Sequence, residues 1–385
     1  MALRARVEHT IDVAPTPPPP AKPKKQSAFY ALRIILVNFV IFVVLAELIS
    51  LAIVNWPRWP SSRPNYHVNH KQFWIDSDLA TGHWHPPNSQ FLHQDGCFSV
   101  HYSTNSYGAR DVERSIHSDK PRTIVLGDSM IEGLGLPDDQ RLSNVLEQRT
   151  GREHLNFGMG GTGPLQYALL YKTMAARFDH NVVMVGVLPD NDFHDMDAVY
   201  AKAHGKGDLY RPYYAADFSV FYTGHFQPNA IDDRFDYIED YLRAYLASYH
   251  VGQYIHNRLG WGGYRSSFVP YSGYNDFTDV DIARLEHALE DIKATADAHD
   301  ARVAIFLIPR AIDFKRLHEA HQNRLGPLME QWGQQAGIPI KDLMPEMDAK
   351  SGGDYRSYFL MCDDHWAARG AATAADVLLP WLHYN

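Results

Sequence analysis

Beyond residue 120, short runs of apolar, often β-branched residues alternate with longer segments in which apolar positions recur at helical spacing. We expect five strands, at Thr123–Leu126, His154–Phe157, Val182–Leu188, Arg302–Ile308 and Ile338–Lys341. We expect helices between and after them, at Gln140–Arg149, Leu165–Arg177, Ile282–His299, Arg316–Ala336 and Ala367–Leu382. Alternating strands and helices predict a mostly parallel sheet covered on both faces, so residues 120–385 are expected to form a three-layer α/β/α sandwich.

A different pattern stands near the N-terminus, where Ile34–Val54 is almost unbroken in apolar residues. As a helix this run would cross the ~30 Å hydrocarbon core of a membrane. A cleaved signal peptide is one alternative, but its apolar region is about 7–15 residues long. A buried core helix is another, but it would not lie between a Pro-rich tail and the sequence Trp-Pro-Arg-Trp-Pro. We therefore predict a transmembrane anchor over residues 33–55, in contact with the lipid bilayer.

The charges around this run predict its orientation. Residues 1–32 are rich in proline and in basic residues and carry few apolar side chains, so we expect a disordered tail. Basic residues are sparser after the apolar run, and the positive-inside rule then places the tail in the cytoplasm. A lead-in segment, residues 56–119, and the large domain are expected on the periplasmic or extracellular side.

A long stretch separates the third predicted strand from the fourth, and we interpret residues 195–280 as an insertion rich in tyrosine and phenylalanine. Aromatic residues between Phe235 and Tyr249 recur at helical spacing, which favours packing within the insertion itself. For Tyr210, Tyr213 and Tyr214, contact with a ligand and packing within the insertion both remain open.

Four blocks of polar and glycine residues stand out in the sequence, and the first three lie at the ends of predicted strands. Gly127-Asp128-Ser129 follows the first strand, and Asn156-Phe157-Gly158-Met159-Gly160-Gly161-Thr162-Gly163 includes the end of the second. Pro189-Asp190-Asn191-Asp192 follows the third strand, and Cys362-Asp363-Asp364-His365-Trp366 lies near the C-terminus. Because parallel strands end at one edge of a sheet, the first three blocks are expected to meet there.

These four blocks, in this order, resemble those of the SGNH (GDSL-type) hydrolase family, and the resemblance covers about residues 85–385. It implies that the sheet is of the flavodoxin-like type found in that family. It also implies that Ser129 is the nucleophile and that Gly161 and Asn191 help to bind an oxyanion. It also implies that Asp363 and His365 complete a Ser-His-Asp triad. Two positions depart from the family pattern, because Gly160 stands where a serine is usual and Ala367 where an asparagine often follows His-Trp.

The implied chemistry is nucleophilic catalysis. A serine hydroxyl needs an adjacent base, here His365, whose tautomer Asp363 would hold. Asp364 is the alternative orienting group, although a solvated or helix-capping carboxylate is the more economical interpretation. The oxyanion would be bound by the N–H of Ser129, the N–H of Gly161 and the amide of Asn191. Gly161 and Asn191 also fit ordinary turn and loop roles.

Three functions fit this set of residues. The first is a serine ester hydrolase that removes O-acyl groups, most simply acetyl groups, from a surface glycan or a similar polar ester. The second is an O-acyltransferase that modifies an exopolysaccharide with the same triad. The third is a non-catalytic glycan-binding or scaffold module, for which five such residues together would be unnecessary.

Composition narrows the choice of partners. A formal net charge of −9, without a basic block in the globular part, argues against general nucleic-acid binding. No metal or organic cofactor is indicated, because the histidines between 67 and 93 lack a clean ligand spacing. In an oxidising compartment Cys97 and Cys362 could form one bridge to the loop that carries His365; two buried free thiols are the alternative.

Overall fold

The computed structural model describes residues 28–56, 59, 63–68, 73–95, 97–226, 234–259 and 271–382. The chain divides into two compact units, Met1–Ile49 and Ser50–Asn385. Most of the predicted tail, up to residue 27, lies outside the described residues. The helix α1 (Ala28–Val54) begins several residues before the predicted anchor, and its first turn therefore lies outside the predicted apolar span.

Within the described residues, α1 is the one helix long and apolar enough to cross a membrane. Its mean hydropathy reaches 2.8 over Phe29–Val54, and few of its side chains are buried. A membrane anchor and a signal sequence both have this length and composition.

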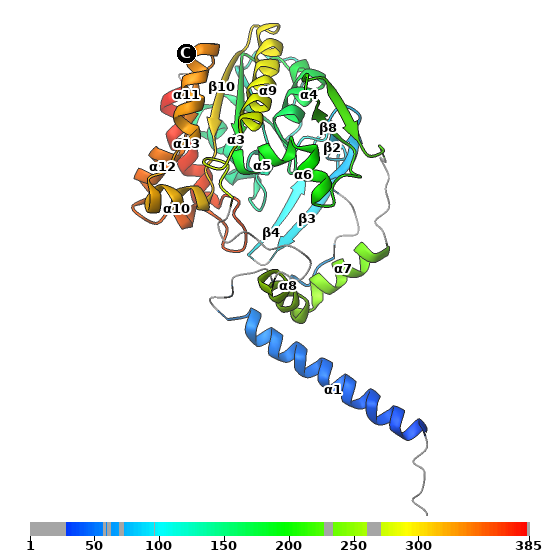
Figure 1. The fold of residues 1–385 in the computed structure, drawn as a ribbon. Helices are drawn as coiled ribbons and strands as arrows, with labels where there is room; N and C mark the ends of the chain where they lie inside the picture. The colour runs from blue at the N-terminus through cyan, green and yellow to red at the C-terminus, as the bar shows by residue number, and fades with distance from the viewer. Residues whose placement is uncertain are drawn as a thin grey trace, which may run out of the picture. The chain divides into compact units, whose positions relative to one another are not determined.

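The second unit is built around a five-stranded parallel sheet (Figure 1). Its strands are β5 (Arg122–Gly127), β6 (Glu153–Gly158), β7 (Val182–Val187), β10 (Arg302–Leu307) and β11 (Ile340–Asp342). Their order is β11-β10-β7-β5-β6, and the pairs β5–β6, β5–β7, β7–β10 and β10–β11 are all parallel. Every residue of β5 and β7 is buried, as expected for strands covered on both faces. The five predicted strands and the flavodoxin-like sheet are confirmed.

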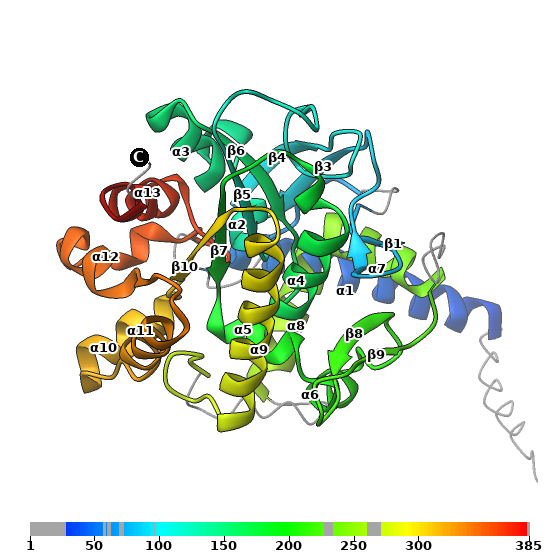
Figure 2. The ribbon, with the colours of Figure 1, turned by 90° about the horizontal axis from the view of Figure 1, so that it is seen from above.

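Helices cover both faces of the sheet, as Figure 2 shows. On one face α3 (Leu142–Thr150) packs against α13 (Ala368–Leu382), which also contacts α12 (Met344–Ser351). On the other face α4 (Pro164–Thr173) packs against α9 (Asp279–Asp297). The predicted α/β/α sandwich is therefore confirmed.

One predicted helix is wrong as a single element. The segment Arg316–Ala336 belongs to two helices, α10 (Ala311–Ala320) and α11 (Leu325–Ala336). His321 ends α10 in the left-handed conformation, with φ of 53°. Asn323 then accepts a hydrogen bond from the Gly326 N–H at 3.1 Å, in the first turn of α11. The apolar spacing continues through this break, so periodicity alone did not reveal it.

The predicted lead-in segment carries more structure than a linker. Its described residues form two antiparallel hairpins, one from β1 (Ile75–Asp78) and β2 (Gly82–Trp84) and one from β3 (Gln90–Asp95) and β4 (Phe98–Ser103). Cys97, next to the turn between β3 and β4, forms a disulfide with Cys362. The alternative of two free thiols is therefore wrong. This disulfide joins the β3–β4 hairpin to the loop that carries His365.

The insertion contains a short hairpin and several helices. They are α6 (Ala198–Ala203), β8 (Arg211–Tyr214), β9 (Val220–Thr223), α7 (Arg234–Tyr245) and α8 (Ala247–Leu259), and the short helix α5 (Pro189–Asp195) comes directly before them. The helical spacing between Phe235 and Tyr249 corresponds to α7 and the start of α8. The remaining short elements of the domain are α2 (Ser129–Glu132) and 3₁₀ turns at Asp138–Gln140, Ala175–Arg177 and Tyr355–Tyr358.

Candidate active site

The carboxyl edge of the sheet carries Ser129 at the start of α2, directly after β5. Asp128 caps this helix, because its Oδ1 accepts a hydrogen bond from the Met130 N–H at 2.9 Å. Gly127 allows the close approach of strand and helix, since a Cβ there would lie 2.3 Å from Cγ1 of Ile131. Asn191 follows β7, the neighbour of β5, so both residues lie where the strand order reverses and where open α/β sheets bind ligands.

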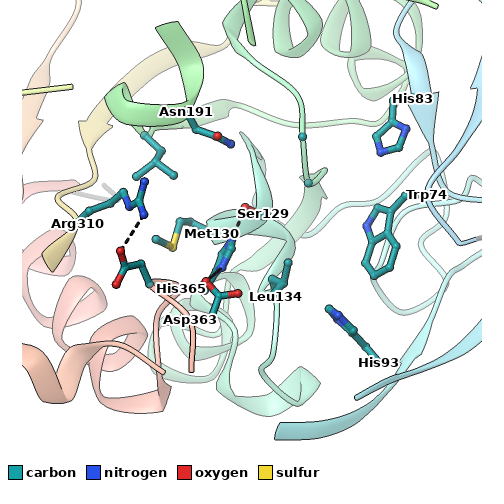
Figure 3. A pocket seen from close by; sticks show the side chains of 14 residues that line it. Trp74, His83, His93, Ser129, Met130, Leu134, Asn191, Arg310, Asp363 and His365 are labelled. Atoms are coloured by element: carbon teal, nitrogen blue, oxygen red, sulfur yellow. Dashed lines mark hydrogen bonds and ion pairs between the residues drawn. The ribbon is translucent and has the colours of Figure 1, made fainter. Parts of the chain in front are cut away.

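Three side chains from distant parts of the chain are hydrogen-bonded in series (Figure 3). Ser129 Oγ lies 2.7 Å from His365 Nε2, and His365 Nδ1 lies 2.8 Å from Asp363 Oδ1. Asp364, the alternative partner of the imidazole, instead accepts from Arg310 Nη2 at 2.8 Å. The loop before α13 thus brings His365 and Asp363 to the serine and directs Asp364 away from the imidazole.

The imidazole of His365 is protonated more readily in this site than it would be in water. Burial by itself would lower the pKa of His365, but the hydrogen bond and the charge of Asp363 raise it above its usual value. Burial would raise the pKa of Asp363, yet the hydrogen bond to His365 holds it below its usual value. Such a pair stabilises the imidazolium that forms when a histidine takes a proton from a serine.

Hydrogen-bond donors surround the same point. The N–H groups of Ser129 and Gly161 have no hydrogen-bond acceptor among the residues that the structure describes. Gly161 is exposed, with φ of 69°, a conformation that suits glycine. The Asn191 side chain lies near the buried Asp128, whose pKa burial raises to about 6. All three donors line one cavity with His365.

A buried carboxylate supports this arrangement from behind. Glu132, on α2, accepts hydrogen bonds from the Gly160 N–H at 2.7 Å and from the Trp74 indole N–H at 3.0 Å. His85 Nε2 lies 3.2 Å from the same carboxylate. A Cβ at position 160 would lie 2.9 Å from Glu132 Oε2 and 3.5 Å from Cβ of Ser129. Gly160, which departs from the family pattern, therefore leaves room for the Glu132 carboxylate.

We expect Gly160→Ser to disturb the loop that carries Gly161. The added side chain meets a carboxylate that several hydrogen bonds hold in place, so the loop must move away from it. Overpacking of this kind costs about 1–3 kcal/mol of stability. Misplaced oxyanion donors would lower kcat on an acetyl ester by about tenfold or more.

Gly252→Ser is the matched control, because a Cβ there meets nothing within 4 Å. Thermal melting and steady-state kinetics of both variants make the comparison. A Gly160→Ser enzyme with the kcat of the unmodified protein would contradict the role given to this contact.

The cavity around Ser129 has a volume of about 510 Å³ and two chemically different sides (Figure 3). Trp74, His83 and His93 line one side, and Arg310 lies on the other. None of these four residues was predicted from the sequence to line the site. Arg310 follows β10 closely, so its position at a strand end was a usable signal. The other three lie in the segment interpreted as a lead-in, where no sequence pattern indicated a contact with the cavity.

Among the described residues that line this cavity, Tyr210, Tyr213 and Tyr214 are absent. Tyr213 and Tyr214 are almost fully buried, and the Tyr214 hydroxyl lies 3.4 Å from an Asp291 carboxylate oxygen. Tyr210 donates to the Leu79 carbonyl at 3.0 Å. Their positions fit packing between the β8–β9 hairpin and its neighbours rather than contact with a ligand in this cavity.

No family model and no curated protein matches the chain. Many of the solved structures similar to it are GDSL-type or SGNH hydrolases. The central sheet with helices on both faces agrees with the fold that the sequence resemblance implied.

Three solved structures illustrate the range of this similarity. A lipolytic G-D-S-L family protein from Veillonella parvula is 11% identical, with a TM-score of 0.37, over 69% of this chain and 99% of that one. A GDSL-like lipase from Bacteroides thetaiotaomicron is 11% identical, with a TM-score of 0.36, over 70% and 91%. A carbohydrate esterase family 2 enzyme from Corynascus thermopiles is 11% identical, with a TM-score of 0.36, over 70% and 68%. Because these TM-scores are below 0.5, the chemistry proposed below rests on the site itself.

Proposed function

We propose that this protein is a membrane-anchored serine ester hydrolase of the SGNH type. Its substrates are O-acyl esters, most simply acetyl esters, of a surface glycan or a similar polar molecule. The observation that carries this proposal is the series Ser129–His365–Asp363, at 2.7 and 2.8 Å, beside N–H groups that have no acceptor within the described part of the chain. A hydroxyl, a base, an orienting carboxylate and oxyanion donors are the parts that acyl transfer requires.

The reaction would proceed in two halves. Ser129 Oγ attacks the ester carbonyl carbon while His365 Nε2 takes its proton, and Asp363 stabilises the imidazolium. The N–H groups of Ser129 and Gly161 and the amide of Asn191 bind the oxyanion. The carbon–oxygen bond of the ester then breaks as His365 protonates the leaving alcohol. Water, deprotonated by His365, attacks the acyl-enzyme and releases the acid.

Trapping of the acyl-enzyme tests this function. We expect an acetyl ester to add one acetyl group to Ser129, detectable by mass spectrometry after an acid quench, and acetate to be released on longer incubation. The same assay with a sugar acceptor separates hydrolysis from transfer, since a transferase moves the acetyl group to the sugar. An absence of both acyl-enzyme and product would favour a non-catalytic binding module.

The apolar helix α1 and the disulfide support an anchored domain outside the cytoplasm. The span Ile34–Val54 would lie in the bilayer, with the basic N-terminal segment on the cytoplasmic side. The Cys97–Cys362 disulfide agrees with this orientation, because disulfides persist in oxidising compartments and are rare in the cytosol.

A reporter fused after Asn385 tests the orientation. We expect an alkaline phosphatase fusion, which needs an oxidising compartment, to be active, and a fluorescent reporter that matures only in the cytoplasm to be dark. When the same two reporters are fused to the N-terminus, the phosphatase should be inactive and the fluorescent reporter bright. A bright cytoplasmic reporter at the C-terminus would reject both the orientation and a surface substrate.

A further inference from the structure

The side of the cavity opposite Arg310 is formed by the two N-terminal hairpins and the residues just before them. Trp74, His83 and His93 line it, and Figure 3 shows the indole between the two imidazoles. The Trp74 indole N–H lies 3.0 and 3.2 Å from the two oxygens of the buried Glu132 carboxylate. The orientation of the indole is therefore set before any ligand arrives, which lowers the entropic cost of binding.

The two imidazoles of this wall are uncharged near neutral pH. Burial lowers the pKa of His83 well below its usual value and that of His93 to about 4. His93 Nδ1 lies 2.9 Å from the Tyr102 hydroxyl, which leaves Nε2 for the cavity. A neutral imidazole offers one donor and one acceptor, so the wall can exchange hydrogen bonds with hydroxyl groups without carrying charge.

The opposite side offers no unpaired positive charge. Arg310 is the only Lys or Arg among the described residues that line the cavity. Its guanidinium contacts the carboxylates of both Asp190 and Asp364. A ligand carboxylate or phosphate would therefore lose water without gaining a free cation, which is unfavourable.

We propose that Trp74, His83 and His93 bind the uncharged sugar ring that carries the acyl group. This inference rests on the proposed ester hydrolysis and narrows its substrate class to neutral sugars. A pyranose has an apolar C–H face, which suits an indole, and a rim of hydroxyls, which suits neutral imidazoles. Uronic acids and sugar phosphates lack a matching partner among the cavity residues that the structure describes.

The apolar residues beside the nucleophile complete the assignment. Met130, Leu134 and Leu188 line the same cavity, and Met130 and Leu188 are nearly fully buried. They form a small patch suited to a short acyl group, while the polar wall remains for the alcohol part of the ester. In this arrangement the sugar is the leaving group of acylation.

The test compares two kinds of substrate in the full chain purified in detergent. Acetylated glucose, mannose, galactose and xylose are the sugar esters, and p-nitrophenyl acetate is an ester without a sugar. We expect Trp74→Ala to lower kcat/KM on the preferred sugar acetate about tenfold more than on p-nitrophenyl acetate. Trp56→Ala, an exposed tryptophan outside the cavity, is the matched control and keeps the ratio of the two substrates.

Trp74→Phe separates sugar binding from support of Glu132. Phenylalanine keeps an aromatic face but cannot donate to the carboxylate, so it should retain most of the preference for the sugar acetate. If Trp74 acts only by holding Glu132, the Phe and Ala variants lose activity on both substrates equally, and the proposal is rejected. A neutral-sugar site also requires acetylated glucuronic acid to be hydrolysed at least about tenfold less efficiently than acetylated glucose; equal efficiency overturns it.

Calorimetry distinguishes a failed subsite from a failed catalytic assignment. Ser129→Ala, which cannot form an acyl-enzyme, should still bind the preferred sugar acetate, and addition of Trp74→Ala should weaken that binding about tenfold. Binding without turnover in the unmodified protein would reject the hydrolase and retain the sugar site. Turnover of p-nitrophenyl acetate with neither binding nor turnover of any of the four sugar esters would reject the sugar site alone.

Discussion

Ser129→Ala is expected to abolish ester hydrolysis while leaving the fold intact. Loss of the nucleophile in a Ser-His-Asp hydrolase lowers kcat by about 10⁶. The change removes one oxygen at the mouth of a cavity, where Ser129 Oγ bonds mainly to His365, so the melting temperature should hardly move. Steady-state kinetics, covalent labelling by a fluorophosphonate and thermal melting measure the three quantities.

Ser143→Ala is the matched control for this experiment. Ser143 is also buried and hydrogen-bonded, on α3, but does not line the cavity. We expect it to lose some stability and to keep its labelling. Labelling of Ser129→Ala at the rate of the unmodified protein would mean that a different residue is the nucleophile.

Asp363→Asn is expected to have the second largest effect. Asp363 Oδ1 contacts His365 Nδ1 at 2.8 Å, and an amide there favours the wrong imidazole tautomer. The corresponding change in a serine protease lowers kcat by about 10⁴. The neighbouring Asp364→Asn provides the comparison, because that carboxylate pairs with Arg310 and is half exposed. A half-exposed ion pair contributes at most about 1 kcal/mol to stability. We therefore expect Asp364→Asn to lose less than tenfold in kcat.

The pH dependence of kcat/KM supplies an independent check on the same pair. His365 must be neutral to accept the serine proton, so activity should fall as the pH drops through its pKa. Since Asp363 raises the pKa of His365 above 6.5, the acid limb of the unmodified enzyme should lie above pH 6.5. In Asp363→Asn the residual activity should show an acid limb at lower pH, because burial then dominates. An acid limb that stays in place would contradict the assignment of Asp363, as would a larger kcat loss in Asp364→Asn.

Local sequence patterns were sufficient for the core of the fold. Val182–Val187 and the other strands of the sheet are short apolar runs between helical segments. Such strands are typically buried between two helical layers. The order of motifs placed Ser129, Gly161 and Asn191 at strand ends, and parallel strands bring their carboxyl ends to one edge. Asp363 and His365 are two residues apart, so one loop presents both. The carboxylate that contacts the imidazole was therefore predictable from spacing.

Other features depended on contacts between residues far apart in the chain. Trp74, His83 and His93 reach the cavity only because the N-terminal hairpins pack beside α2, a contact that no local periodicity encodes. The break at His321 depends on one left-handed residue, which an uninterrupted apolar pattern conceals. The disulfide required Cys97 and Cys362 to meet across 265 residues of sequence.

The sequence by itself determined the layers of the fold, the apolar helix and the residues at the strand ends, because periodicity and strand direction are local properties. Only the tertiary structure decided what surrounds Ser129. The Glu132 carboxylate that explains Gly160, the indole that it orients and the pairing of Arg310 with two aspartates are interactions between segments. Their geometry follows from how the hairpins, α2 and the loop before α13 pack around one cavity, and packing is set by the whole chain.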